Sequence, residues 1–173
     1  MIKLEPLTGH HERKAFDCGV EPLNTWLKQT ALQHQTKGIS RTFVAIPADG
    51  QIVDQYRSLG YDDISSVSIL GFYALASAFV LIDDLPSDIA KRYPRQVPVT
   101  RLGRLAIRTD LQGQGLGRLL LADAVNRAKS AAQAVGSAGL FVDAKDETSS
   151  SFYQSFGFRI CDDQPLKLYL PMW

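Results

Sequence analysis

Arg104-Leu-Ala-Ile-Arg-Thr-Asp-Leu-Gln-Gly-Gln-Gly-Leu-Gly-Arg118 joins an apolar, strand-like run to a strongly periodic helix through a loop that contains three glycines. Glycine lets a backbone turn tightly and lets a ligand come close to it. The first N–H groups of a helix have no partner inside the helix and carry a partial positive charge, which makes an anion site. We therefore expect residues 112–118 to hold a phosphate-bearing ligand by backbone amides. The alternative is a helix-entry turn that binds no ligand.

The spacing of the glycines narrows the kind of ligand. A Walker loop has Lys and then Ser or Thr after its last glycine, whereas Arg118 follows the last glycine here. The dinucleotide motif G-x-G-x-x-G also fails, because the glycines at 113, 115 and 117 are two residues apart. The pattern that fits is Gln/Arg-x-x-Gly-x-Gly, from Gln112 to Gly117. It resembles the pyrophosphate loop of the GNAT superfamily of N-acetyltransferases, which bind acetyl-coenzyme A.

The segment after this helix extends the resemblance. Gly139 to Lys145 is typical of a short buried strand, and Glu147 to Phe156 of a short helix that Gly157 ends. Phe158 to Cys161 then indicates another strand. Phe152-Tyr153-Gln-Ser-Phe156-Gly157-Phe158 is similar to the F-Y-x-x-x-G-F signature of that superfamily. The resemblance implies an α/β (α+β) fold in which helices flank a central mixed and mostly antiparallel sheet, splayed at the acetyl-CoA site.

Length and composition indicate one globular domain, which we place at residues 1–173. Hydrophobic residues make up 45% and charged residues 21%, which is ordinary for a soluble protein. The N-terminus lacks the apolar run of a signal peptide, and no apolar stretch approaches the roughly 20 residues of a membrane span. We expect a cytoplasmic protein without membrane contact, in which Cys18 and Cys161 are reduced thiols. The sequence shows no spacing typical of a metal site.

Basic residues are concentrated in one part of the chain although the net charge is only +1. Residues 91–129 carry nine Lys or Arg against two acids, so this segment is +7 and the rest of the chain is −6. One interpretation is that these residues serve an anionic cofactor or a solvated helix face. The other is a track for nucleic-acid phosphates.

The remaining elements follow from periodicity and from turn residues. The expected elements are a strand at 1–7, a helix at 22–37 that Gly38 ends, a strand at 41–46, a turn at 48–50, a polar surface loop at 51–65, a strand at 66–76 with Gly71 at a bulge, a short helix at 87–93, a strand at 98–108 and a helix at 116–134 that Gly136 ends.

Acetyl transfer from a thioester to an amine needs a held pantetheine, a polarised carbonyl and a proton for the leaving thiolate. The edge of a strand can hold pantetheine amides, and Leu105, Ala106 and Ile107 are the candidates through their main chain. Tyr153 is the candidate acid, because a phenol with a pKa near 10 is protonated at pH 7. Its offset of about 100° from Phe152 on a helix indicates a side chain that leaves the core. The alternative is a core aromatic.

Further segments give a closer resemblance, to the acetyltransferase toxins of bacterial toxin–antitoxin pairs. They are Phe16 to Asn24 followed by Trp26-Leu27, Ser40 to Val44, Gly71 to Leu75, Pro98 to Ala106, and Phe141 to Lys145. The resemblance implies an enzyme that acetylates the α-amino group of aminoacyl-tRNA and stalls translation. It implies a cytoplasmic homodimer, a ribbon-helix-helix antitoxin that neutralises it, and operator DNA bound only through the antitoxin complex. An α-amine of low pKa would need little help from a general base, and none is identified.

Carried over by position, this resemblance makes Tyr153 the catalytic residue and assigns a loop that binds the pyrophosphate of acetyl-CoA. The loop consists of Gln112, Gly113, Gln114, Gly115, Leu116, Gly117 and Arg118. The candidate tRNA contacts are Lys37, Arg41, Arg92 and Arg95.

Two features depart from the family pattern: Arg108 stands where many relatives have an acid, and the segment at 51–65 looks long. Two other functions stay open. One is acetylation of a small amine or a protein amine, which the low net charge favours. The other is a non-catalytic acyl-CoA-binding module, against which Tyr153 and the loop argue.

Overall fold

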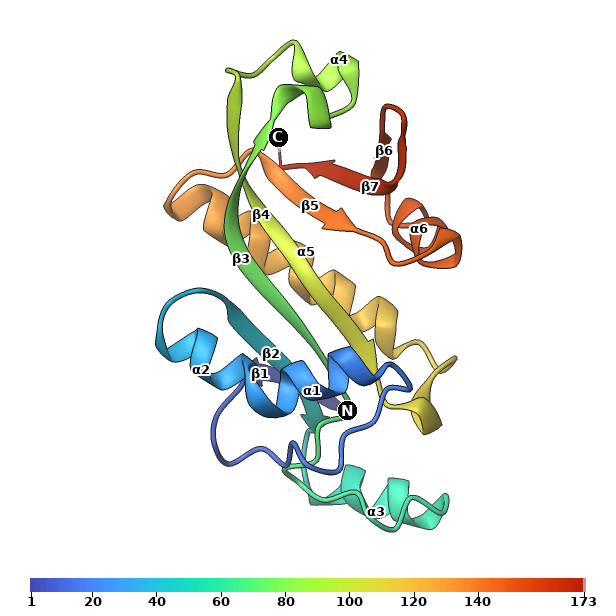
Figure 1. Ribbon diagram of the computed structural model, residues 1–173. Helices are drawn as coiled ribbons and strands as arrows, with labels where there is room; N and C mark the ends of the chain where they lie inside the picture. The colour runs from blue at the N-terminus through green and yellow to red at the C-terminus, as the bar shows by residue number, and fades with distance from the viewer. Residues whose placement is uncertain (173) are drawn as a thin grey trace. The chain divides into compact units, whose positions relative to one another are not determined.

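The computed structural model describes residues 1–172, whose strands form one seven-stranded sheet with helices beside it (Figure 1). The strands are β1 (Ile2–Pro6), β2 (Arg41–Pro47), β3 (Gly71–Leu81), β4 (Gln96–Ile107), β5 (Gly139–Asp143), β6 (Arg159–Cys161) and β7 (Gln164–Pro171). The helices are α1 (Glu21–Gln29), α2 (Ala31–Thr36), α3 (Gly50–Ser58), α4 (Ser87–Ala90), α5 (Leu116–Ala134) and α6 (Glu147–Gln154), with 3₁₀ turns at Ile82–Asp84 and Thr109–Leu111.

The strand order is β1-β2-β3-β4-β5-β7-β6. β1 with β2, β5 with β7, and β6 with β7 are antiparallel pairs, whereas β4 with β5 is a parallel pair. The prediction of a mixed, mostly antiparallel sheet flanked by helices is therefore confirmed.

The chain divides into two compact units, and the boundary between them falls inside β3, β4 and α5. Unit 1 contains residues 1–74 and 104–123, and unit 2 contains residues 75–103 and those from 124 onward. The assignment of residues 1–173 to a single acetyltransferase domain stays a prediction.

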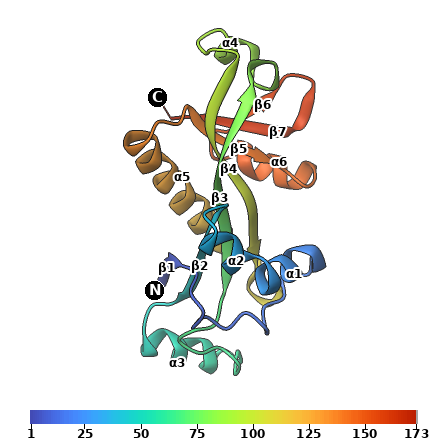
Figure 2. The same ribbon diagram turned by 60° about the vertical axis from the view of Figure 1, so that its left-hand side comes forward.

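Aromatic side chains fill the core of unit 1. The Trp26 ring stacks on Phe72 with centroids 6.1 Å apart, and Phe16 meets Phe72 edge-on at 5.4 Å. The single helix predicted at 22–37 is wrong in one respect, because Thr30, at φ −121°, separates α1 from α2. The Gln35 side chain joins α2 to its neighbours: its amide nitrogen donates to the Leu7 carbonyl at 2.7 Å, and its amide oxygen accepts from the Thr42 N–H at 3.0 Å. Figure 2 shows α2 beside β2 as a result.

The prediction of a surface loop over residues 51–65 is wrong, because Gly50–Ser58 forms α3. The carboxylate of Asp49 caps this helix by accepting from the Ile52 N–H at 3.0 Å, so the turn predicted at 48–50 is the helix start. Only Ile52 and Val53 anchor α3 in the core, and two apolar residues give too weak a period to indicate a helix from sequence.

β3 runs from Gly71 to Leu81, about five residues later than predicted, because a serine turn occupies residues 65–68. The Ser65 N–H donates to the Ser68 hydroxyl at 2.9 Å there. Gly71 marks a close approach, and the bulge expected there stays a prediction. A Cβ on Gly71 would stand 2.7 Å from Ile107 Cδ1 and 2.9 Å from the Ala106 carbonyl oxygen, so only glycine lets β3 and β4 approach this closely.

In unit 2, β7 forms antiparallel pairs with both β5 and β6, and α6 lies beside β7 (Figure 1). The buried core consists of Leu85, Ile89, Val97, Val99, Phe141, Cys161 and Tyr169. Cys18 and Cys161 are both buried and form no disulfide, in agreement with the two reduced thiols expected. Over residues 1–172, the helices are too short or too polar to cross a membrane.

Candidate active site

The glycine loop between β4 and α5 has the backbone geometry of an anion site. Gly113 and Gly115 adopt φ +79° and +89°, a conformation that favours glycine. No heavy atom lies within 4 Å of the place where a Cβ would stand on either residue, so the space beside the loop is open. The Leu119 N–H donates to the Gly115 carbonyl at 3.2 Å, so the N–H groups of residues 116 and 117 precede the first helical hydrogen bond. They lie at the positive end of a 19-residue helix.

β4 extends beyond its pairing with β5. The parallel register covers Thr100 to Leu102, and β5 ends at Asp143, whereas β4 continues to Ile107. The predicted main-chain contacts for pantetheine, at residues 105–107, lie in this extension. The splay of the sheet at this place stays a prediction.

The Gln112 side chain folds back onto the protein. Its amide donates to the carbonyl oxygens of Cys18 at 3.1 Å and Ile107 at 3.0 Å. The Thr109 N–H donates to the Asp17 carbonyl at 2.9 Å. Gln112 therefore fixes the shape of the loop, and its amide nitrogen is already engaged.

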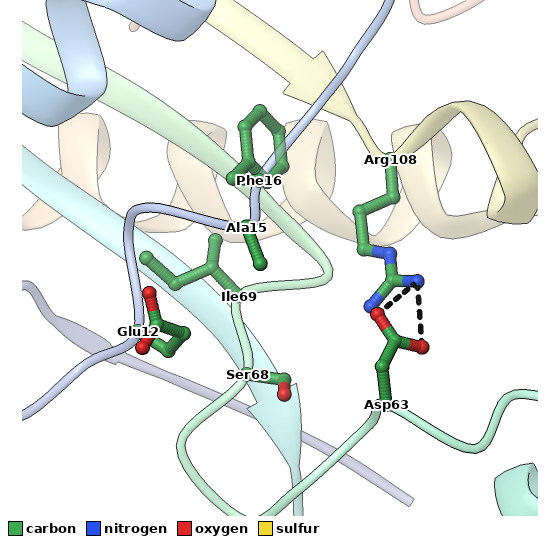
Figure 3. Close-up of a pocket in the computed structure, with 7 residues that line it drawn as sticks. All are labelled: Glu12, Ala15, Phe16, Asp63, Ser68, Ile69 and Arg108. Atoms are coloured by element: carbon green, nitrogen blue, oxygen red, sulfur yellow. Dashed lines mark hydrogen bonds and ion pairs between the residues drawn. The ribbon is translucent and has the colours of Figure 1, made fainter.

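Arg108 is buried and ion-paired at the start of the loop (Figure 3). Its guanidinium lies 2.6 Å from the Asp110 carboxylate and 3.3 Å from that of Asp63. Burial lowers the pKa of Arg108, but the two carboxylates outweigh this effect and raise it, so the guanidinium stays charged. The small cavity beside it, about 30 Å³, has room for water and is too small for acetyl-CoA.

Tyr153 lies on the buried face of α6, so the prediction of a side chain leaving the core is wrong. Its exposed fraction is 7%, whereas Phe152 and Phe156 are only half-buried. The reason is that the hydroxyl of Ser150, one helical turn earlier, donates to the Pro165 carbonyl of β7 at 3.0 Å and turns this face inward. The Phe158 ring lies 5.6 Å from that of Tyr153. Burial raises the pKa of Tyr153 to about 12, so the phenol keeps its proton at every physiological pH.

Comparisons with known proteins agree with this geometry. Residues 90–169 match the family described as "Acetyltransferase (GNAT) domain". The tRNA-acetylating toxin of Mycobacterium tuberculosis H37Rv is 36% identical over 158 residues, which cover 91% of this chain and 84% of that protein. The chain belongs to the GNAT acetyltransferase toxins. The predictions of the family, of its fold and of an N-acetyltransferase are thereby confirmed.

Two solved structures show this GNAT fold over nearly the whole chain. The toxin AtaT complexed with acetyl-methionyl-tRNAfMet has a TM-score of 0.82 at 31% identity, covering 99% of this chain and 95% of that one. A mutant of AtaT bound to acetyl-CoA and to the C-terminus of the antitoxin AtaR has a TM-score of 0.76 at 30% identity, covering 99% and 93%.

In this GNAT toxin the candidate tRNA contacts are divided between the two units. Lys37 and Arg41 are exposed in unit 1, and Arg92 and Arg95 are exposed in unit 2. Among the basic residues at 91–129, Arg101 pairs with the carboxylate of Asp143, and Arg108 pairs with carboxylates as described above. The +7 charge of that segment therefore overstates the charge that it offers to a substrate.

Sequence reasoning missed two residues beside the loop of this acetyltransferase, Tyr61 and Asp63. Both lie in the segment that looked long for the family, and Asp63 pairs with Arg108, the other departure. The two departures from the family pattern are therefore connected through this ion pair. Arg108 was the signal in the sequence, because a buried arginine requires a carboxylate partner from elsewhere in the chain. Over residues 1–172, no three His, Cys, Asp or Glu side chains are grouped for a metal ion; independence from metal stays a prediction.

Proposed function

We propose that this acetyltransferase transfers the acetyl group of acetyl-CoA to the α-amino group of aminoacyl-tRNA and thereby blocks translation. The observation that carries the proposal is the relationship to a tRNA-acetylating toxin over 91% of the chain. The similarity to AtaT in complex with acetyl-methionyl-tRNAfMet supports the same substrate class. The proposal includes a cytoplasmic homodimer, neutralisation by a ribbon-helix-helix antitoxin, and contact with operator DNA only through the antitoxin complex.

The residues of the loop fit the coenzyme. Gly113 and Gly115 leave open space beside the backbone, and the start of α5 attracts a diphosphate through the backbone amides of residues 112–118. The main chain of Leu105, Ala106 and Ile107 holds the pantetheine amides, and one N–H there polarises the acetyl carbonyl. When bound, acetyl-CoA supplies an activated thioester that an amine attacks with loss of the coenzyme thiol.

Tyr153 is the proposed general acid, and the family signature around it is what links it to the loop. Its phenol is protonated throughout the working range, because burial raises its pKa to about 12. An exposed thiol has a pKa of about 8.5, well below that of Tyr153. Proton transfer from Tyr153 to a fully formed thiolate in water would therefore be energetically unfavourable. We therefore assign Tyr153 the role of a hydrogen-bond donor whose proton follows the negative charge as it develops on sulfur.

The amine substrate supplies the other half of the chemistry. An ordinary lysine amine has a pKa of about 10.4 and is mostly protonated at pH 7, whereas an α-amine has one of about 8 or below. At the same pH, a far larger fraction of α-amines than of lysine amines is therefore unprotonated, and the α-amine of an aminoacyl ester needs less help from a base. This agrees with the absence of a recognisable general base from the sequence motifs.

Mass spectrometry of total tRNA after incubation with enzyme and isotopically labelled acetyl-CoA tests the proposal. We expect labelled N-acetyl-aminoacyl adenosine after nuclease digestion, and none with the Tyr153→Phe variant. If every aminoacyl-tRNA stays unmodified while a polyamine or peptide amine is acetylated, the alternative function stands. The pairing of Arg101 and Arg108 with carboxylates is the observation that favours that alternative.

A further inference from the structure

Residues 50–64 contact the glycine loop through the hydroxyl of Tyr61. This hydroxyl donates to the Asp110 carbonyl at 3.1 Å and accepts from the Gln114 side-chain amide at 3.3 Å. One hydroxyl can make both bonds at once, because it has one proton and two lone pairs. Tyr61 therefore connects the start of the loop to its middle.

A second contact, made by Asp63, lies two residues further along the chain. Its carboxylate faces the guanidinium of Arg108, which is 8% exposed and also pairs with Asp110. Figure 3 shows Asp63 and Arg108 side by side at the edge of the small cavity. The Arg108 N–H in turn donates to the Leu70 carbonyl at 3.0 Å. Both ends of residues 108–114 are thus held from one segment.

The segment itself is well anchored. Its helix α3 is capped by Asp49, and the Arg57 Nε–H donates to the carbonyl of Ile64, which is completely buried. The Tyr56 ring supports that of Tyr61 edge-on at 5.8 Å. A loop with three glycines loses much conformational entropy when it becomes ordered, so contacts that fix it beforehand improve ligand affinity.

We propose that Tyr61 and Asp63 are positioning residues for acetyl-CoA, which hold residues 108–114 in the conformation that binds the diphosphate. The proposal rests on the proposed function of the loop. Neither side chain needs to touch the coenzyme, because each acts through the loop: Tyr61 through Asp110 and Gln114, and Asp63 through Arg108.

The test compares Tyr61→Phe and Asp63→Asn with wild type, using Asp62→Asn as the matched control at an exposed neighbouring carboxylate. Calorimetry measures the Kd of acetyl-CoA, and hydrogen exchange follows the amides of residues 109–118 without ligand. For Tyr61→Phe, which removes both bonds of this hydroxyl, we expect a Kd weaker by at least about three- to tenfold, the typical effect of losing one hydrogen bond. For Asp63→Asn we expect about a two- to fivefold change, since its carboxylate is largely exposed. Loop amides should exchange faster in both variants, and Asp63→Glu should restore affinity.

Acetyl-pantetheine separates positioning of the loop from a general loss of structure, because it lacks the diphosphate. Its KM, the kcat at saturating acetyl-CoA and the melting temperature should stay at wild-type values in both variants. Unchanged acetyl-CoA affinity in both variants, or an equal loss for acetyl-pantetheine, would overturn the positioning role while leaving the proposed function intact. Failure of the wild-type protein to bind acetyl-CoA would overturn both.

Discussion

The hydroxyl of Tyr153 is the single group on which the proposed chemistry depends most. The ring that carries this hydroxyl is buried, with the rings of Phe152 and Phe158 at 5.4 and 5.6 Å. Packing and chemistry can therefore be separated by Tyr153→Phe, which keeps the ring and removes the proton. We expect kcat to fall by about 10²- to 10⁴-fold, the usual value of general acid catalysis, with unchanged melting temperature and acetyl-CoA affinity.

Steady-state kinetics on aminoacyl-tRNA, with calorimetry on acetyl-CoA as control, check this expectation. The pH profile adds an independent test. Because the pKa of Tyr153 is raised to about 12, the acid form is lost only as pH rises through that value, and no decline in rate due to Tyr153 should occur between pH 7 and 9. A variant with wild-type kcat would remove Tyr153 from the mechanism.

At the scale of elements, the loop and α5 form the part of the site that sequence predicts best. The predicted helix at 116–134 has the observed bounds, and the glycine after it, Gly136, has φ +99°. Glycine spacing and helical period are local properties, so one sequence suffices for them. The loop's supports were not predictable in this way, because Tyr61 and Asp63 lie about 50 residues away in sequence.

The burial of Tyr153 was missed for a similar physical reason. Helical periodicity gives the angle between two side chains, but it does not tell which face of a short helix a later strand covers. The bond from Ser150 to Pro165 in β7 decides the face, and β7 follows α6 in the chain. Periodicity also gave no sign of the break at Thr30, which separates α1 from α2.

Binding of the diphosphate by the glycine loop can be tested by placing a negative charge at the centre of this loop. Gly115→Glu puts a carboxylate at the positive start of α5, where the diphosphate is proposed to bind. Like charges about 4 Å apart at a protein surface repel by about 4 kcal/mol before salt screening, so acetyl-CoA affinity should fall at least tenfold. Gly136→Glu is the matched control, since it has a similar positive φ and flanks the other end of the same helix.

Both substitutions impose backbone strain of roughly 1–3 kcal/mol, which thermal unfolding should report equally. Calorimetry should then show weak acetyl-CoA binding for Gly115→Glu alone. A folded Gly115→Glu protein with wild-type affinity would place the diphosphate elsewhere.

At the scale of the whole molecule, the proposed substrate, aminoacyl-tRNA, is a polyanion, whereas the chain has a net charge of only +1. Among the basic residues at 91–129, Arg101 and Arg108 form ion pairs with carboxylates of the same chain. If the substrate is aminoacyl-tRNA, as proposed, its attraction depends on exposed cations such as Arg92 and Arg95, with Lys37 and Arg41 in the other unit. Local placement of charge therefore matters more for this enzyme than net charge.

Charge reversal at Arg92 and Arg95 tests this dependence. Each Arg→Glu change removes two units of charge, so the double variant has a net charge of −3, as does the control Lys14→Glu with Lys28→Glu. If the two arginines bind phosphates, the KM for aminoacyl-tRNA should rise about tenfold or more. The slope of log affinity against log salt should become shallower by roughly 0.7–0.9 for each phosphate that the variant no longer neutralises. Acetyl-CoA affinity should stay unchanged. An equal rise of KM in the control would mean that net charge alone attracts the tRNA, and wild-type KM and salt slope in the Arg92/Arg95 variant would exclude this surface from the substrate site.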